Sequence, residues 1–336
     1  MKFLIVGLGS MGKRRIRCLK RLKYNNIAGF DLRSDRRSEV KDKYNIPVFN
    51  NALNAIKELK PDVMIISVPP DAHHIYMLLA AEQGIHFFVE ASVVDTSMKK
   101  IISLIDKANI VGIPSATLLY HPAVNKIKEL ITNKNFGKIS NLIYHSGQYL
   151  PDWHSHEKVS DYYVSNPETG GCREIVPFEL TWIIDLLGFP VRVCAQKGKS
   201  INIEGAELID DTYNILLGYN NMLATITVDV VSRKATRNLL INFENTQLRW
   251  DWNNDYIEYY DSRSKKFTKV YYSKGNAEKG YNENIDEYMY VNELSDFIKT
   301  VKKGKVFKNT LKKDHDILKL LYCIEKSSNT NKYVNF

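Results

Sequence analysis

The sequence lacks long apolar runs. No stretch of the 336 residues approaches the roughly 18 apolar residues that span a bilayer, so we expect no membrane-spanning helix. The apolar stretch near the N-terminus covers only Phe3 to Val6 and runs into glycines, which does not resemble a signal peptide. Cysteine is scarce too, with four residues far apart and none of the spacings of metal sites. We therefore expect a cytoplasmic protein with reduced thiols and no bound metal.

The sequence also shows no dense run of basic residues with aromatic residues between them. The chain has 47 basic and 38 acidic residues, a net charge of +9, and the excess lysines look spread along it. Nucleic-acid-binding domains usually concentrate their basic residues and place aromatics between them. A mild positive field suits a small anionic substrate, such as a nucleotide sugar or sugar acid. We therefore expect a small-molecule partner of that kind, and neither a nucleic acid nor a membrane.

What the first 121 residues contain is an alternation of short apolar strands and helices. Apolar residues recur every three to four positions in the helical segments. The pattern predicts strands at 2–6, 27–31, 63–68, 86–90 and 110–114, and helices at 11–23, 35–44, 51–59, 72–83 and 97–108. Such alternation forms a doubly wound parallel sheet of the Rossmann type, covered by helices on both faces.

Beyond residue 121 the pattern changes to longer strands. We expect a helix at 123–133, a strand at 138–149, a helix at 174–187 and closing helices at 285–302 and 311–325. Between 191 and 272 the pattern predicts long strands, at 213–217, 223–231, 238–243, 248–252, 256–260 and 268–272. This predicts an α+β domain with a large, mostly antiparallel sheet and helices on one face. The fold class is thus α/β, with a dinucleotide-binding domain at 1–121 and a substrate-binding and oligomerisation domain at 122–336.

A glycine-rich loop follows the first strand, in the stretch Gly7-Leu8-Gly9-Ser10-Met11-Gly12. In G-x-G-x-x-G, Gly7 permits a tight turn, Gly9 lets the backbone approach a pyrophosphate, and Gly12 lets helix and strand pack closely. The helix N-terminus behind the loop offers N–H groups to phosphates. Ser10 and Met11, inside the loop, are expected to contact the same ligand. A glycine turn without a ligand is the alternative.

The residue that distinguishes NAD from NADP lies at the end of the second strand. Asp31 could accept hydrogen bonds from ribose hydroxyls, which favours NAD. Arg33 and Arg36 follow at once and could instead hold a 2′-phosphate, so NADP stays possible.

Two more strand ends carry candidate cofactor contacts, because ligands in such sheets lie at the strand C-termini. Pro69 and Pro70 form a stiff loop suited to flanking a nicotinamide. His73 either touches the cofactor or packs against this loop. Glu90 ends a later strand and could orient ribose or substrate.

Taken together, these features resemble the Gfo/Idh/MocA oxidoreductase family over essentially the whole chain. The shared marks are Gly7–Gly12, Pro69-Pro70 with His73, Ala80, Gly84, Val89-Glu90, Tyr120-His121-Pro122-Ala123 and Gly170-Gly171. The resemblance implies NAD(P)-linked oxidation or reduction at a sugar or cyclitol carbon. It also implies an open sheet that often builds dimers or tetramers. The stretch from Gly147 to His154 is similar to a branch concerned with bacterial surface sugars, including nonulosonic acids.

Three departures from the family pattern concern proton transfer. The position of the family's catalytic lysine holds Ala91, and Phe178 and Thr181 stand where that branch's histidine and aspartate would lie. The usual proton-handling groups are therefore absent at these positions. Either the chemistry has been rearranged or it has been lost.

Other residues of the same segments could replace the missing groups. Glu174 and Glu179 could act as acid or base if burial raises the pKa of either, and Arg173 could clamp an anionic group. His154 could transfer protons near neutral pH. The alternative is a helix N-terminus that is rich in acid for dipole reasons, with an ordinary ion pair.

Substrate contacts are expected from a loop and a strand in the second half. The resemblance places Tyr149, Asp152 and Trp153 over the substrate, and Arg233 and Arg237 could receive an anionic group. The alternatives are a structured surface loop anchored by Trp153 and, for the arginines, a solvated sheet edge or a subunit interface. Our first hypothesis is an NAD(P)-dependent sugar oxidoreductase of surface-polysaccharide biosynthesis, active as a homodimer or homotetramer. The alternatives are an NAD-binding protein without net redox activity and an enzyme that recycles NAD during elimination or epimerisation.

Overall fold

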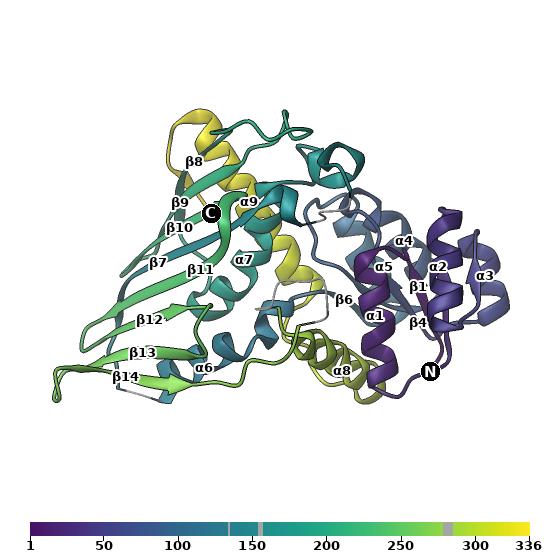
Figure 1. Cartoon of the computed structure of the whole chain (residues 1–336), viewed down its shortest axis with the longest axis horizontal. Coiled ribbons are helices and arrows are strands. Elements are labelled where there is room, and N and C mark those ends of the chain that lie inside the picture. The colour runs from purple at the N-terminus through teal and green to yellow at the C-terminus, as the bar shows by residue number, and fades with distance from the viewer. Residues whose placement is uncertain (134, 154–156, 278–284) are drawn as a thin grey trace. The chain divides into compact units, whose positions relative to one another are not determined.

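The computed structural model describes residues 1–133, 135–153, 157–277 and 285–336 (Figure 1). The chain divides into two compact units, each made of two stretches. Unit 1 comprises Met1–Thr117 and Tyr288–Asp316, and unit 2 comprises Leu118–Glu287 and Ile317–Phe336. The compact units are thus discontinuous in sequence, whereas the expected domains were the continuous ranges 1–121 and 122–336. The assignment of functions to those two ranges stays a prediction.

Unit 1 contains the parallel Rossmann-type sheet that the alternation predicted. Its six strands lie in the order β3-β2-β1-β4-β5-β6, and all neighbours are parallel. Every residue of β1, β2 and β4 is buried, which explains why these strands read as continuous apolar runs. The strands are β1 (Phe3–Val6), β2 (Ile27–Phe30), β3 (Val48–Phe49), β4 (Val63–Ile66), β5 (His86–Val89) and β6 (Gly112–Pro114).

The strand order of unit 1 reverses at β1, which lies between β2 and β4. Ligands of such sheets bind beyond the strand C-termini at this point, and the glycine loop follows β1 directly. The helices of this unit are α1 (Ser10–Arg21), α2 (Ser34–Tyr44), α3 (Ala52–Leu59), α4 (His73–Glu82) and α5 (Met98–Ala108), joined by most of α8 (Glu287–Lys303).

Unit 2 is built on a nine-stranded sheet in the order β14-β13-β12-β11-β7-β10-β9-β8-β15. All neighbouring strands run antiparallel except β7 and β10, so the predicted mostly antiparallel sheet is confirmed. The strands are β7 (Ile139–Tyr149), β8 (Arg192–Gly198), β9 (Thr212–Gly218), β10 (Leu223–Asp229), β11 (Val231–Phe243), β12 (Gln247–Asp251), β13 (Tyr256–Asp261), β14 (Lys266–Tyr271) and β15 (Val334–Asn335).

Helices cover one face of this sheet. Helix α6 (Pro122–Asn133) packs against β13, and α7 (Cys172–Leu187) packs against β9 and β10; most of α9 (Leu311–Thr330) belongs to the same unit. Most inward positions of the strands are apolar, as in Leu239 and Ile241 of β11, and they alternate with less buried residues on the other face. In the described part of the chain, no helix is long and apolar enough to cross a membrane.

One edge of the sheet in unit 2 is closed by the C-terminal segment. Strand β15 pairs with β8 over only two residues. Farther along β8, the hydroxyl oxygens of Ser327 and Ser328 accept hydrogen bonds from the backbone N–H groups of Ala195 and Lys197, each at 3.0 Å. Side chains of α9 thus occupy edge positions of β8 that another strand could otherwise pair with.

Candidate functional site

The glycine loop of unit 1 has a backbone that other residues would not fit. Gly7 has a φ of +92°, and a Cβ placed there would lie 2.5 Å from the Ser67 carbonyl oxygen. A Cβ at Gly12 would lie 1.9 Å from the Gly7 carbonyl oxygen. Helix α1 begins at Ser10 with Gly9 as its N-cap, and its first turn has no acidic residue and no side-chain cap. The first turn of α1 thus places no acidic side chain at the positive end of the helix dipole, which suits a phosphate.

Asp31 braces this loop from the end of β2. Its Oδ2 accepts a hydrogen bond from the Leu8 N–H at 2.7 Å, and its Oδ1 accepts one from the Arg33 N–H at 2.9 Å. The side chain is almost buried, with 7% of the residue's surface exposed. Asp31 is therefore held in contact with the loop that would receive a dinucleotide.

Arg36, rather than Arg33, extends toward the glycine loop. The Arg33 guanidinium forms an exposed ion pair with Asp35 at 2.6 Å. Arg36 Nη1 lies 3.9 Å from Asp31 Oδ2 and 3.4 Å from the position of a Cβ built on Gly9. The sequence offered both arginines for a 2′-phosphate, and this geometry favours Arg36.

His73 packs against the proline loop that follows β4. Its Nε2 lies 3.0 Å from the Val68 carbonyl oxygen, and because a carbonyl can only accept, Nε2 carries the proton. Burial lowers the pKa of His73 to about 4, so the ring is neutral. The adjoining Pro70 begins a short 3-10 helix, Pro70–Ala72, preceded by Pro69. These contacts make His73 a brace of the loop; a direct contact with cofactor stays a prediction.

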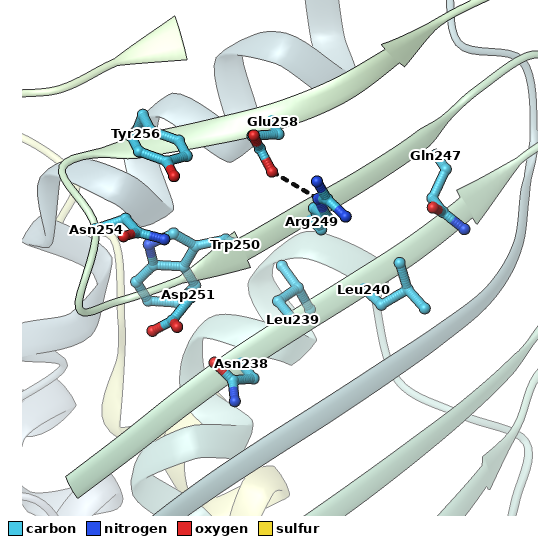
Figure 2. A pocket seen from close by; sticks show the side chains of 10 residues that line it. All are labelled: Asn238, Leu239, Leu240, Gln247, Arg249, Trp250, Asp251, Asn254, Tyr256 and Glu258. Carbon is cyan, nitrogen blue, oxygen red and sulfur yellow. Dashed lines mark hydrogen bonds and ion pairs between the residues drawn. The ribbon is translucent and has the colours of Figure 1, made fainter. Parts of the chain in front are cut away.

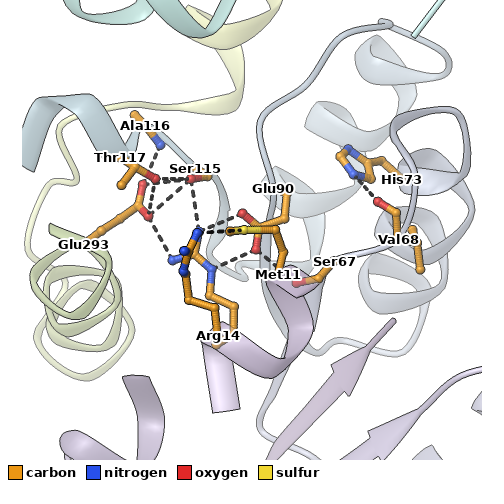
Figure 3. A network of polar contacts seen from close by, with 11 residues as sticks. Met11, Arg14, Ser67, Val68, His73, Glu90, Ser115, Ala116, Thr117 and Glu293 are labelled. Atoms are coloured by element: carbon orange, nitrogen blue, oxygen red, sulfur yellow. Dashed lines mark hydrogen bonds and ion pairs between the residues drawn. The ribbon is translucent and has the colours of Figure 1, made fainter. Parts of the chain in front are cut away.

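Glu90 belongs to a buried polar network of unit 1 (Figure 3). Both of its carboxylate oxygens accept hydrogen bonds from Arg15, at 2.8 and 2.7 Å, and Oε1 also accepts one from the Ser67 hydroxyl at 3.0 Å. Burial alone would raise the pKa of Glu90, but the Arg15 guanidinium outweighs it and holds the pKa below its usual value. The charged carboxylate thus ties helix α1 to the ends of β4 and β5, next to Ala91.

The network continues to helix α8 through Arg15, which is fully buried. Arg15 Nη1 lies 3.0 Å from Glu293 Oε2, and Glu293 also accepts hydrogen bonds from Ser115, Ala116 and Thr117. Sequence reasoning missed both residues. The available signal was an arginine at an inward position of an amphipathic helix, because a buried cation requires a buried anion.

Glu179, a predicted proton carrier, is saturated with hydrogen bonds in unit 2. Its Oε2 accepts from Tyr144 Oη at 2.7 Å and from Trp182 Nε1 at 3.0 Å, and its Oε1 accepts from Ser146 Oγ and Arg237 Nε, both at 2.9 Å. The residue is fully buried. These contacts hold α7 on β7 and β11, and they favour an anchoring role for Glu179 and for Arg237.

Glu174, in the first turn of α7, is less fully engaged. Its Oε1 accepts a hydrogen bond from Tyr163 Oη at 2.8 Å, while the buried Oε2 has no hydrogen-bond partner within the described ranges. Burial raises the pKa of Glu174 to about 7, and the bond from Tyr163 opposes this only in part. Glu174 therefore has the properties of a group that exchanges a proton near neutral pH.

Arg173 turns toward α9. Its Nε lies 2.6 Å from Glu325 Oε1, and Nη1 donates to the Glu168 carbonyl oxygen. The guanidinium is thus engaged within the protein, which supports an anchoring role more than an anion clamp.

The predicted substrate residues of unit 2 fall into two groups. The exposed Arg233 guanidinium lies over the Tyr149 ring at 3.8 Å from its centroid, so the structure brings these two together. Asp152 is exposed, and Trp153 has a buried Nε1 for which the described residues supply no partner. His154 lies outside the described residues.

A histidine–aspartate pair that the sequence analysis did not single out lies on β7 and β10. His145 Nε2 is 2.6 Å from Asp229 Oδ2, and the Ser232 hydroxyl donates to the same oxygen at 3.0 Å. Burial would raise the pKa of Asp229, but these donors hold it below its usual value. Alternation along β7 places His145 on the face opposite the Glu179 network.

One open pocket of about 480 Å³ lies over β11, β12 and β13 (Figure 2). Its lining includes Asn238, Gln247, Asp251 and an ion pair between Arg249 and Glu258 at 2.6 Å. None of the predicted site residues lines it. Within the part of the chain that the structure describes, the buried side-chain atoms that lack a hydrogen-bond partner include none from the residues that line this pocket. The pocket therefore adds no reacting group.

The described residues hold no cluster of three or more His, Cys, Asp or Glu side chains that could bind a metal ion. The buried Cys172 donates its thiol hydrogen to the Val228 carbonyl oxygen at 2.9 Å, and burial raises the pKa of this thiol well above its usual value. Cys172 is therefore a poor nucleophile.

Comparison with known proteins finds a family match in the first part of the chain. Residues 1–111 match the Gfo/Idh/MocA model, described as an oxidoreductase family with an NAD-binding Rossmann fold. A search of curated proteins finds no match to the chain.

Solved structures match the chain over nearly its whole length. An oxidoreductase from Agrobacterium radiobacter, solved with NAD+, L-tartaric acid and magnesium, has a TM-score of 0.87 at 14% identity, with 100% of this chain and 98% of that one covered. Levoglucosan dehydrogenase with NADH and levoglucosan scores 0.85 at 16%, covering 100% and 99%. UDP-N-acetylglucosamine 3-dehydrogenase from Acidithiobacillus ferrooxidans scores 0.78 at 16%, covering 98% of each chain. At such identities the likeness establishes a shared fold.

Proposed function

We propose that this chain, whose residues 1–111 match the model of the Gfo/Idh/MocA oxidoreductase family, belongs to that family and oxidises or reduces a carbinol carbon of an anionic sugar. The observation that carries the proposal is the glycine loop. Its backbone excludes side chains at Gly7 and Gly12, and the first turn of α1, which begins in the loop, has no acidic residue. That arrangement fits the pyrophosphate of a dinucleotide. Solved neighbours of the same fold that hold NAD+ or NADH support it.

Glu174 is the residue that we propose as proton carrier. When bound, the dinucleotide would accept hydride from the substrate carbon in one direction and donate it in the other. In the oxidation direction, Glu174 would take the hydroxyl proton at Oε2, the oxygen that its hydrogen bond from Tyr163 leaves available. A pKa of about 7 suits both the uptake and the release of that proton. Glu174 would thus supply what Ala91, Phe178 and Thr181 cannot.

We assign the binding of an anionic sugar to Arg233 and Tyr149. The exposed Arg233 guanidinium, stacked on Tyr149, offers a cation beside an aromatic face, which suits a carboxylate or phosphate on a sugar ring. The resemblance around Gly147 to His154 motivates the finer proposal of a role in surface-polysaccharide biosynthesis. A cytoplasmic homodimer or homotetramer belongs to the same proposal. Titrating nucleotide sugars and sugar acids against wild type and Arg233→Gln would test the charge requirement.

The proposal is tested first by fluorescence titration with NADH and with NADPH. Asp31, held against the loop, predicts tighter binding of NADH, and Arg36 is the residue that would support NADPH instead. Gly9→Ala should weaken binding, because its Cβ would enter the space in front of the loop, 3.4 Å from Arg36 Nη1. Gly198→Ala, where a Cβ meets nothing within 4 Å, is the control. Failure of the wild type to bind either dinucleotide would sink the proposal.

A second candidate rests on Ala91, which cannot exchange a proton. A protein that binds NAD without net redox chemistry would bind NADH as expected but turn over no sugar. A recycled cofactor would instead alter the sugar with no lasting change in nicotinamide absorbance. Chromatographic analysis of the sugar, run beside the absorbance assay, separates these two from the oxidoreductase.

A further inference from the structure

The positive charge of this chain is concentrated in two stretches of unit 1. Residues 10–24 contain seven basic residues and no acidic one, and residues 297–313 contain seven lysines and no acidic residue. The remainder of the chain has 33 basic and 38 acidic residues and is net negative. The even spread expected from the sequence is therefore wrong, since two short stretches account for the whole excess.

The fold places these two stretches against each other within unit 1. Lys302 Nζ donates to Tyr24 Oη at 2.8 Å, and the Arg21 guanidinium lies over the Tyr288 ring at 5.6 Å. Figure 1 shows α1 and α8 side by side in this unit. We call the exposed cations there the basic face; it comprises Arg21 and Lys23 of the first stretch and Lys302, Lys303 and Lys305 of the second. Asp296, which pairs with Lys299 and Lys305, is the acid beside them.

The basic face lies away from the end of the sheet that carries the glycine loop. Tyr24, which contacts Lys302, also packs edge-on against Phe3, the first residue of β1, with ring centroids 5.2 Å apart. The glycine loop follows the other end of the same strand. A partner on the basic face would therefore leave the dinucleotide loop accessible.

Apolar groups accompany the lysines. Val306, between Lys305 and Lys308, is 86% exposed, and Tyr288 is 55% exposed. Single exposed apolar residues are ordinary on soluble proteins. Here, however, a valine and a tyrosine are set among cations, the combination found where proteins rest on the headgroup layer of a membrane.

We propose that the basic face docks unit 1 onto a membrane surface rich in anionic phospholipid. Clusters of four to eight basic residues bind such surfaces through their field, without a fixed geometry. A nucleic acid is less well served, because Lys302 and Arg21 lie over the rings of Tyr24 and Tyr288 and compete with bases for stacking on those ring faces. A protein partner is disfavoured since lysine is depleted at protein interfaces. We had expected no membrane partner because the sequence has no membrane-spanning segment, and this proposal departs from that expectation.

The test is co-sedimentation with vesicles of phosphatidylcholine, with and without about one third phosphatidylglycerol. Each basic residue near an anionic surface contributes about fivefold to partitioning, so Lys302→Gln/Lys303→Gln/Lys305→Gln should lower it by about 10²-fold. The matched control is Lys99→Gln/Lys100→Gln/Lys107→Gln, which removes three exposed lysines from α5 of the same unit. Both variants should keep the wild-type urea midpoint, which shows that they fold.

The expected result is binding to the anionic vesicles only, loss in the α8 variant, retention in the α5 variant, and release at 1 M salt, where the Debye length is about 3 Å. Three results would each overturn the proposal. They are absence of wild-type binding at 0.1 M salt, equal loss in both variants, and tighter binding to a duplex DNA fragment than to the vesicles at the same salt concentration.

Discussion

Replacing Glu179 by glutamine distinguishes an anchoring carboxylate from a proton carrier. Glu179→Gln keeps the shape of the side chain and removes its charge. Arg237, with 7% of its side chain exposed, would then lose the carboxylate that lies 2.8 Å from its Nη2. The amide would also turn an NH2 group toward one pair of donors, either Ser146 and Arg237 or Tyr144 and Trp182. Whichever way it rotates, two donors would lose their acceptor.

The magnitude follows from burial. Removing one partner of a buried ion pair costs about 3–5 kcal/mol, because the other charge stays buried without compensation. The urea dependence of unfolding for units of this size is about 2 kcal/mol per molar. We therefore expect the transition that reports on unit 2 to move down by about 2 M urea. Fluorescence of Trp182, which lies within the network, gives the readout, with the other tryptophans replaced by phenylalanine.

Glu258→Gln is the matched control, since it removes the carboxylate of a partly exposed ion pair with Arg249 on the same sheet. Exposed pairs contribute about 0–1 kcal/mol, so its midpoint should move little. The double variant Glu179→Gln/Arg237→Gln should recover part of the loss, because it removes both charges. If Glu179→Gln kept wild-type stability and lost turnover by about 10²-fold, the anchoring role would be refuted and Glu179 would be the proton carrier.

Further outcomes follow from the described contacts. In the oxidation direction kcat/KM should rise with pH through about 7, the value to which burial raises the pKa of Glu174, and Glu174→Gln should lose that limb and about 10²-fold in rate. Burial likewise raises the pKa of Asp314 to about 7, above its unfolded value of 3.8. The stability that this carboxyl contributes is therefore fully present below pH 4 and is lost as the pH rises to 7. Asp314→Asn should remove the fall of the urea midpoint between pH 4 and 7 and leave the variant more stable than wild type at pH 8 by a few kcal/mol. An unchanged dependence of the urea midpoint on pH would contradict this. Arg36→Ala should leave NADH affinity nearly unchanged and weaken NADPH affinity, as measured by titration, and the reverse pattern would show that Arg36 does not hold the 2′-phosphate.

The fold could be predicted from the sequence where burial is uniform or alternating. The strands of unit 1 are buried on both faces and appear as apolar runs, so β1, β4 and β5 were expected to within one or two residues. Strand β11 was expected only from residue 238 onward, because its first half contains Ser232, Arg233 and Lys234 beside a register shift. Strand β15 has two residues and is defined by its partner β8, which no local pattern can reveal.

The candidate site was predictable only where a motif fixes the backbone. The glycine spacing specified the loop, and the end of β2 specified Asp31. The side-chain networks could not be foreseen, since Arg15 meets a carboxylate 278 residues away and Arg237 meets one 58 residues away. Polar residues at inward positions, such as Tyr144 and Ser146 on β7, were the available warning, because buried donors require an acceptor.

The serine pair on α9 has a practical consequence for handling this protein. Ser327 and Ser328 occupy backbone donors of β8 that would otherwise be available to a strand from another molecule. Ser327→Ala/Ser328→Ala would remove both acceptors and leave these backbone donors available for such pairing. Preparations of that variant should self-associate at concentrations where the wild type remains monodisperse.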